Sequence, residues 1–357
     1  MIRLAYFISP HGFGHAARAA AVMAALHAHN PAFHFEIFTR VPRWFFAESV
    51  RGAFTYHAWL TDVGLVQDSA LRENIPQTLT QLAEFFPFAA APVAALAARV
   101  ARLKCRAVLC DIAPLGIAVA RQAGVPSVLI ENFMWDWIYG GYARAEARFQ
   151  PHIAFLRGVF RSADWHIQTE PVCRRTCADL VVPPVAREPR TPAKTIRAEL
   201  GIPRGAKVVL ITMGGIPQQH AFLEQLTQVP RVHFILPGNG AREEKRDNVI
   251  GLPHRSRFYH PDLLNASDAV IGKAGYSTVA EAYRAGIPFG YIARAKFRES
   301  KPLGDFIETE MRGREISARA FETGKWLAAL PALLELPRVA RTVPNGAAQI
   351  ARWFVAG

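Results

Sequence analysis

The sequence predicts an α/β protein of two domains, each with a parallel sheet covered by helices. Three observations lead to this prediction. The chain has 357 residues, which is more than one average domain. Short β-rich runs alternate with apolar-periodic helical runs. A segment rich in proline and charge, residues 183–194, has the composition of a linker, and the same alternation starts again after it.

The first half supplies a domain over residues 1–182. Helices are expected at residues 16–27 and within 75–103, where Pro87 or Pro92 breaks the apolar pattern into two helices. The expected strands are residues 3–9, 35–39, 54–59, 107–111, 127–131 and 165–169.

The second half supplies a domain over residues 195–340 and a C-terminal segment, 341–357, with an amphipathic helix at 345–355. The expected strands are residues 207–212, 233–236, 248–251, 269–272 and 289–292. The expected helices are residues 218–227, 262–266, 276–285 and 301–310.

Composition excludes several classes of protein. A content of 51% hydrophobic and 20% charged residues is typical of a packed chain rather than a disordered one. The chain has no apolar run of membrane-spanning length and no signal-peptide pattern, so a cytoplasmic protein is expected. The four cysteines are too few and too irregular for a disulfide framework. We also expect no metal site, because neither a D-x-D run nor a plausible ligand cluster is present.

The net charge of +13 favours anionic partners but does not identify one. The basic residues are spread along the chain, without a helix-turn-helix pattern or an aromatic-basic platform, so nucleic acid is not the expected partner. The apolar and basic stretch 85–103 leaves contact with an anionic membrane surface open, although such a stripe more often belongs to a core.

A glycine-rich loop, SPHGFGHAARA, follows the first predicted strand and opens the first helix. Gly12 and Gly14 allow a tight turn and a close approach to a ligand, and the helix presents free N–H groups there. His11 and His15 bracket the turn, where a neutral imidazole can take a proton from an attacking hydroxyl. The alternative is that both histidines only cap the helix. The third glycine of a dinucleotide fingerprint is absent, which is evidence against a dehydrogenase.

A second loop, VIGKAGYSTVAEAYRAGIPF, runs from a strand through a glycine turn into a helix. Gly275 closes the turn, and the hydroxyls and N–H groups at the helix start suit phosphate oxygens. Lys273 adds a positive charge beside them. Glu281, further along the helix, can accept both hydroxyls of a ribose, or it can simply favour the helix dipole. The helix start consists of Tyr276, Ser277 and Thr278.

This second loop resembles the nucleotide-binding helix of GT-B glycosyltransferases, in particular that of the MurG family. Gly275, Thr278 and Glu281 stand at the spacing of that family, and the AGIP ending of the helix matches as well. The first loop is similar to that family's glycine-rich loop, with His15 at the histidine position. The turn at Met213, Gly214 and Gly215 resembles the one that opens the family's second domain.

Three segments together resemble the glycosyltransferase-like N-terminal half of L-arabinokinases and its bacterial relatives. These segments are HGFGHA, FMWDWIY and GKAGYSTVAEA, and they span both predicted domains. The resemblance implies two Rossmann-like domains facing a cleft, with a C-terminal helix that returns toward the first domain. It also implies a nucleotide-sugar donor, with uridine as the default base, on the second domain, an acceptor on the first, and a diphosphate held without a bound metal. The sugar-kinase half of those proteins has no counterpart here, so kinase activity is not expected.

We expect an inverting transfer in which a base on the first domain deprotonates the acceptor hydroxyl. His15 is the first candidate base, His11 the second and Asp111, at the end of a predicted strand, the third. Gly12 is expected on the acceptor side of the first loop and Gly14 on the donor side. Further acceptor candidates are Glu131, Asn132, Trp135 and Asp136, and further donor candidates are Glu299 and Lys301.

Other readings stay open at this point. A sugar-nucleotide 2-epimerase shares the architecture but needs no acceptor, and a non-catalytic nucleotide-sugar-binding protein needs no base. A nucleic-acid-binding protein is suggested only by the charge. The acceptor is a small molecule, a glycan or a lipid-linked molecule, and the lipid-linked case would place the protein at the inner face of the membrane.

Overall fold

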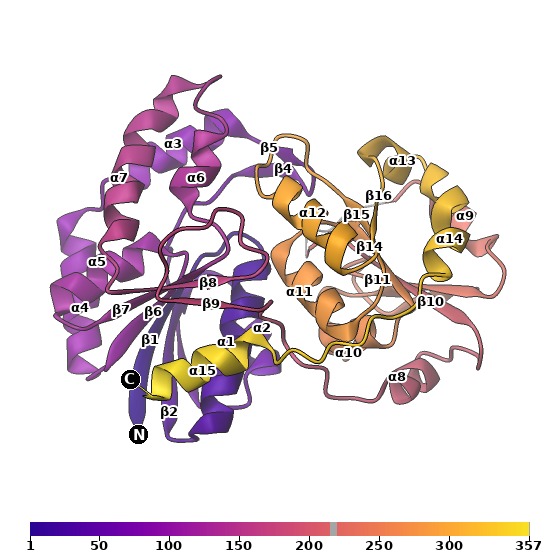
Figure 1. Ribbon diagram of the computed structural model, residues 1–357, viewed down its shortest axis with the longest axis horizontal. Helices are drawn as coiled ribbons and strands as arrows, with labels where there is room; N and C mark the ends of the chain where they lie inside the picture. The colour runs from indigo at the N-terminus through magenta and orange to yellow at the C-terminus, as the bar shows by residue number, and fades with distance from the viewer. Residues whose placement is uncertain (215–219, 357) are drawn as a thin grey trace.

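The computed structural model describes residues 1–214 and 220–356 (Figure 1). The first domain contains a parallel sheet in the order β3-β2-β1-β6-β7-β8-β9. Its strands are β1 (Ile2–Ile8), β2 (Phe33–Thr39), β3 (Phe54–Ala58), β6 (Ala107–Asp111), β7 (Ser127–Glu131), β8 (Trp165–Thr169) and β9 (Leu180–Val182). A small hairpin, β4 (Gln67–Ser69) and β5 (Arg72–Glu73), lies apart from this sheet.

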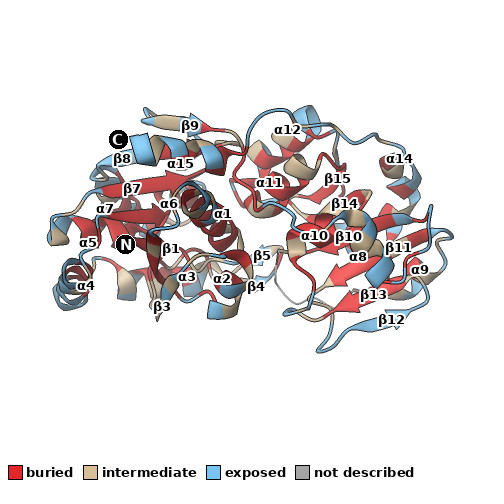
Figure 2. Cartoon of the chain, turned by 90° about the horizontal axis from the view of Figure 1, so that it is seen from below, coloured by how far each residue is buried: buried red, intermediate tan, exposed pale blue. Residues whose placement is uncertain are grey.

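Helices cover both faces of the first sheet. Its central strands are buried, as continuous apolar runs in a parallel sheet predict (Figure 2). The helices are α1 (Gly14–His29), α2 (Arg43–Ser49), α3 (Ile75–Phe85), α4 (Ala90–Arg102), α5 (Pro114–Ala123), α6 (Trp135–Gly140) and α7 (Gln150–Arg161). The predicted break falls at Pro87, because Pro92 lies in the first turn of α4, where its missing N–H is not needed.

The second domain repeats this plan with the sheet order β12-β13-β11-β10-β14-β15-β16, in which β12 is antiparallel. Its strands are β10 (Lys207–Thr212), β11 (Val232–Pro237), β12 (Glu244–Arg246), β13 (Val249–Leu252), β14 (Ala269–Lys273), β15 (Phe289–Ile292) and β16 (Arg314–Glu315). Its helices are α8 (Ala193–Glu199), α9 (Leu223–Thr227), α10 (His260–Asn265), α11 (Tyr276–Ala285), α12 (Ser300–Glu310), α13 (Ala318–Glu322) and α14 (Leu330–Leu334). The prediction of two parallel-sheet α/β domains is confirmed.

Some element boundaries differ from the prediction. The helix expected at 218–227 begins only at Leu223, because Phe222 turns into the core against Phe321 and Trp326. Its first two residues lie outside the described part of the chain. The segment 183–192 contains no helix or strand, and α8 begins at Ala193.

The C-terminal helix α15 (Gly346–Ala356) leaves the second domain and packs on α1 of the first (Figure 1). Its Trp353 meets Trp165 edge to face, with the ring centroids 5.6 Å apart. The helix thereby covers one side of the first sheet, as Ile350 and Ala351 are buried in the same core cluster as α1.

The apolar stripe of 85–103 faces inward. Val93, Leu96 and Val100 belong to the core of the first domain. Among residues 1–214 and 220–356, no single helix is long and apolar enough to cross a membrane; α3 and α4 reach that length only as a pair bent by 69°.

Both domains bring their loops to one cleft. In the first sheet, β2 and β6 lie on opposite sides of β1, and in the second, β11 and β14 lie on opposite sides of β10. Strand order reverses at these points, and ligands bind there in open α/β sheets. The N-termini of α1 and α11 meet across the cleft, since a Cβ on Gly14 would lie 3.8 Å from Ser277 Oγ.

Candidate functional site

A buried cluster of charged residues lies at the N-terminal end of α1. His15 Nδ1 is 3.0 Å from Asp111 Oδ1, at the carboxyl end of β6. Arg18, one helical turn after His15, donates to both carboxylate oxygens at 2.9 and 2.6 Å. Because a carboxylate only accepts hydrogen bonds, the proton of the neutral imidazole lies on Nδ1 and leaves Nε2 as a free base.

Arg18 holds Asp111 in its charged form. Burial alone raises the pKa of the Asp111 carboxyl, but the Arg18 guanidinium and the hydrogen bond from His15 outweigh it, and the pKa is lowered. Arg18 also donates to Asn132 Oδ1 at 2.7 Å and to Thr169. The imidazole of His15 therefore has a fixed ring orientation and a permanently charged partner.

His11, the second candidate base, is set up differently. Its Nδ1 accepts the backbone N–H of Leu65 at 3.3 Å, so in the neutral ring the proton lies on Nε2. Burial, followed by the nearby charge of Arg294, lowers the pKa of His11 well below its ordinary value. His11 is thus a neutral hydrogen-bond donor, and the geometry favours His15 as the base.

Trp135, one of the acceptor candidates, lies in the protein interior and offers no stacking face to a ligand. It is fully buried, and its indole N–H donates to Asp62 Oδ2. The ring meets His11 edge to face at 5.2 Å and stacks on Tyr139 at 5.6 Å. The Trp135 ring packs behind His11 and His15, on the interior side of both histidines. Burial raises the pKa of Asp62, a residue that sequence reasoning missed, to about 7.

The other acceptor candidates divide into two groups. Asn132 lies in the cleft network, bound to Arg18. Glu131 is buried beneath it and accepts hydrogen bonds from His166 and Gln168. Asp136 is also buried, with its carboxylate 3.6 Å from Arg157. Both carboxylates therefore serve the interior of the first domain. Gly12 adopts the left-handed conformation, with φ +71°, that its turn requires.

The N-terminus of α11 forms the opposite wall of the cleft. Ser277 and Thr278, two of the donor candidates, line the pocket described below. Lys273, at the end of β14, lies beside Gly214, where a Cβ would be 3.3 Å from its Nζ. Burial and the charge of Arg294 lower the pKa of Lys273 to about 7.

Two of the predicted donor residues have structural roles instead. Met213 is buried in the core of the second domain. Tyr276 is buried against the interdomain segment, where its hydroxyl accepts the Val185 N–H at 3.1 Å and its ring packs under Arg18. Gly215 lies outside the described residues.

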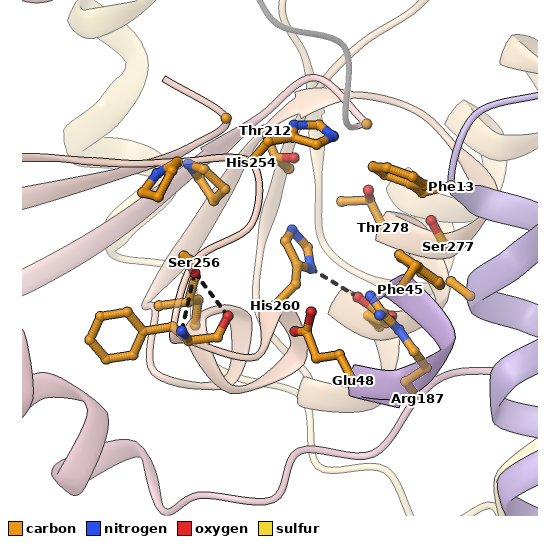
Figure 3. A pocket seen from close by; sticks show the side chains of 18 of the residues that line it. Phe13, Phe45, Glu48, Arg187, Thr212, His254, Ser256, His260, Ser277 and Thr278 are labelled. Atoms are coloured by element: carbon orange, nitrogen blue, oxygen red, sulfur yellow. Dashed lines mark hydrogen bonds and ion pairs between the residues drawn. The ribbon is translucent and has the colours of Figure 1, made fainter. Parts of the chain in front are cut away.

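A pocket extends from the α11 N-terminus between the two domains (Figure 3). One side is aromatic and comes from the first domain, and the other comes from the carboxyl ends of β10, β11 and β13. This combination of flat apolar walls with a few polar groups suits a nucleoside. The lining residues are Phe13, Ala17, Trp44, Phe45, Glu48, Arg187, Thr212, Gly214, Pro237, Gly238, Pro253, His254, Ser256, Phe258, His260, Leu263, Ser277, Thr278 and Glu281.

Glu281 lines this pocket with its carboxylate already oriented. Arg187 Nε donates to Oε1 at 2.7 Å and His260 Nδ1 lies 3.2 Å from Oε2. Burial raises the pKa of Glu281, but Arg187 and His260 outweigh it and the pKa is lowered. Each oxygen keeps a second lone pair, so the carboxylate can still accept ligand hydroxyls. Arg187 also donates to Ser49 of the first domain, which ties the pocket to both domains.

The two candidates after β15 differ in their location. Glu299 is buried in the cleft, where Asn132 Nδ2 donates to its Oε1 at 2.9 Å and Arg294 Nη2 lies 3.8 Å from its Oε2. Lys301 is exposed on the outside of α12 and pairs with Asp305 one turn later. Lys301 is therefore not part of this site, and its charge belongs to a solvated helix face.

Within residues 1–214 and 220–356, no group of three or more His, Cys, Asp or Glu side chains is arranged to hold a metal ion.

Comparison with known proteins identifies the fold. No protein-family model matches the chain. An L-arabinokinase from Arabidopsis thaliana is 30% identical over 331 residues, which are 90% of this chain but 31% of that protein, so the chain spans about a third of its length. UGT71G1 from Medicago truncatula, complexed with UDP-glucose, has a TM-score of 0.62 at 12% identity, with 99% of this chain and 97% of that one covered.

The glycosyltransferase VinC, in complex with DTDP, has a TM-score of 0.56 at 14% identity, with 99% of this chain and 96% of that one covered. The chain therefore has the GT-B fold, in agreement with the sequence resemblance. Its relationship in sequence is to a part of the L-arabinokinase.

Proposed function

We propose that this protein is a glycosyltransferase that moves a sugar from a nucleotide diphosphate sugar to a hydroxyl acceptor. The observation that carries the proposal is the His15–Asp111 pair at the α1 N-terminus. It supplies an oriented base directly across the cleft from the α11 N-terminus, where the nucleoside pocket begins. The structural similarity to proteins in complex with UDP-glucose and DTDP supports a donor of this chemical class.

In this proposal the nucleoside occupies the pocket of Figure 3, with its ribose hydroxyls donating to Glu281. The diphosphate lies at the α11 N-terminus, where free N–H groups and the helix dipole stabilise negative charge. Ser277 and Thr278 add hydroxyls there and Lys273 adds a cation. We take uridine as the base to test first, as the MurG-like sequence pattern suggests.

The chemical step follows from the placement of His15. The acceptor hydroxyl gives its proton to His15 Nε2 while its oxygen forms a bond to the anomeric carbon. The bond from that carbon to the diphosphate oxygen breaks, and the diphosphate leaves with the electron pair. The α11 N–H groups and Lys273 stabilise this charge. Attack from the first domain, opposite the leaving group, inverts the anomeric configuration.

We further propose that this reaction proceeds without a bound metal, because helix N-termini and Lys273 already supply the positive charge that a diphosphate needs. Turnover that is unchanged by EDTA supports this point. Turnover that EDTA abolishes and magnesium restores contradicts it, while leaving sugar transfer itself intact.

The first experiment is calorimetric titration with UDP, dTDP, GDP and ADP, with and without magnesium. Binding of one nucleotide establishes the donor site, and the sugar conjugates of that nucleotide are then incubated with a panel of alcohols, glycans and lipid-linked acceptors. A glycosylated acceptor supports the proposal. Absence of binding to all four nucleotides contradicts it, and a changed sugar with no acceptor product identifies a 2-epimerase instead.

A further inference from the structure

Arg294, directly after β15, is a buried cation with unused hydrogen-bond donors. It is 5% exposed, yet its Nε and Nη1 have no hydrogen-bond partner among the described residues. Its guanidinium lies flat on Phe297, 3.4 Å from the ring centroid. Its Nη2 is 3.8 Å from Glu299, which is beyond hydrogen-bond distance. Burial of a charged group with unsatisfied donors is costly, so an acceptor that reaches these donors lowers that cost.

The guanidinium lies near His11 of the first domain and Lys273 of the second, the two groups whose pKa its charge lowers. Glu299, its nearest carboxylate, accepts a hydrogen bond from Asn132 of the first domain. Asn132 in turn accepts from Arg18, which binds the partner of His15. A continuous set of side chains thus joins Arg294 to the reacting centre.

Other charged groups lie around Arg294. Lys273 is a second cation nearby, and Glu299 is the carboxylate that faces both. The charge of Arg294 adds to burial in lowering the pKa of both Lys273 and His11. The carboxylates of Glu299 and Glu73 oppose the charge of Arg294, but neither accepts a hydrogen bond from its Nε or Nη1, so these donors lack acceptors within the described part of the chain.

We infer that Arg294 binds an anionic substituent of the substrate, a carboxylate or a phosphate, in addition to the diphosphate. This inference rests on the proposed function, since it concerns the same cleft. Arg294 is not among the residues that line the nucleoside pocket. It follows β15, the strand beside β14, and so belongs to the donor domain.

This placement favours the sugar of the donor as the source of the anion, as in a nucleotide diphosphate uronic acid. The two terminal nitrogens of a guanidinium match the two oxygens of a carboxylate; here, among the residues that the structure describes, Nη1 has no hydrogen-bond partner and Nη2 has only the distant Glu299 beside it. An acceptor with a carboxylate or phosphate is the second source of the same chemistry, because His11 of the first domain lies near Arg294.

The test is calorimetric titration with UDP, UDP-glucose and UDP-glucuronate. The proteins are the wild type, Arg294→Met, Arg294→Lys and the control Lys296→Met, which removes an exposed charge two residues away. We expect the wild type to bind UDP-glucuronate at least tenfold more tightly than UDP-glucose. Arg294→Met should abolish this preference and leave the affinity for UDP unchanged. Arg294→Lys should keep part of it and Lys296→Met all of it.

A second titration adds glucuronate to the protein saturated with UDP. One outcome is that the wild type binds glucuronate in this titration and yet shows no preference between the two nucleotide sugars. If Arg294→Met then abolishes the binding of glucuronate, the anion belongs to the acceptor, and the inference is still supported. If Arg294→Met weakens UDP as much as UDP-glucuronate, Arg294 is a diphosphate ligand and the inference is wrong. It is also wrong if the wild type binds both nucleotide sugars equally and does not bind glucuronate. Binding of UDP itself tests the donor site. It therefore tests the proposed function independently of the inference about Arg294.

Discussion

Asn132 Nδ2 donates to Glu299 Oε1 at 2.9 Å and thereby joins the first domain to the second inside the cleft. The same side chain accepts a hydrogen bond from Arg18 through its Oδ1. One amide thus connects the group that orients His15 with a carboxylate of the donor domain. The hydrogen-bond network around His15 therefore extends into the second domain.

Replacement of His15 by alanine is expected to lower kcat by about 10²–10⁴-fold, because a positioned general base contributes about that much. The affinity for the nucleotide sugar should stay the same, since His15 lies on the acceptor side. Steady-state kinetics and calorimetry measure the two quantities. His29→Ala, at the exposed end of the same helix, is the matched control. Normal turnover in His15→Ala, together with loss of turnover in His11→Ala, would show that the base is assigned to the wrong histidine.

Glu281→Ala is expected to weaken nucleotide binding by about 1.5–3 kcal/mol, because hydrogen bonds from the ribose to a charged group are lost. The same change leaves Arg187 buried without its partner, which costs about 3–5 kcal/mol of folding stability. The double variant Arg187→Met/Glu281→Leu removes both charges and should recover much of the stability without recovering affinity. Denaturant unfolding and calorimetry separate the two effects. Wild-type affinity in either Glu281 variant would remove its role in ribose binding.

Asp62 should make folding stability depend on pH near neutrality. Its folded-state pKa of about 7 lies above the value of about 3.9 for an unfolded aspartate, so the folded state binds more protons between these values. The free energy of unfolding should therefore fall as pH rises from about 4 to 7, with Asp62 contributing about 1.4 kcal/mol per pH unit. Asp62→Asn should remove this slope, as measured by urea unfolding across that range.

The control for Asp62 is Asp305→Asn, which alters an exposed carboxylate and should leave the slope unchanged. Equal slopes in the wild type and Asp62→Asn would mean that Asp62 is ionised in the folded protein at neutral pH.

Lys273 should make donor binding pH-dependent. Its pKa of about 7 means that the free protein loses this cation as pH rises through neutrality, whereas a bound diphosphate favours the charged form. The affinity for a nucleotide sugar, whose diphosphate does not titrate in this range, should fall by up to tenfold per pH unit above about 7. Binding should also take up a proton, which calorimetry in buffers of different ionisation enthalpy detects. In Lys273→Met both effects should vanish; if they persist, another group is titrating.

Much of the fold could be predicted from the sequence because its central strands are continuous apolar runs buried on both faces. The glycine turns at Gly14 and Gly275 marked the two helix N-termini that meet in the cleft. Short elements such as β16 and α13 carry too few residues for a periodic signal, and α9 begins at Leu223, directly after Phe222 packs on Phe321.

Sequence reasoning found His15, Asp111 and Glu281 but missed the arginines that hold the two carboxylates. Arg18 stands three residues after His15 on the same helix face, which is a signal that could have been used. No sequence signal pointed to Arg187, because it lies 94 residues from Glu281 in a segment that resembles any charged linker. The sequence left Trp135 open between a sugar site and core packing, because an aromatic residue looks alike in both, and the structure places it in the core.

The chain passes between the domains twice, and the two passages are fastened together. Asn345, just before α15, bonds the backbone of Ala186 through both its donor and its acceptor. A Cβ on Gly346 would lie 2.0 Å from the carbonyl oxygen of Pro183, so the second passage touches the first where only glycine fits. Because the two passages adjoin and are bonded to each other, they fix the relative position of the two domains at one place rather than at two separate ones.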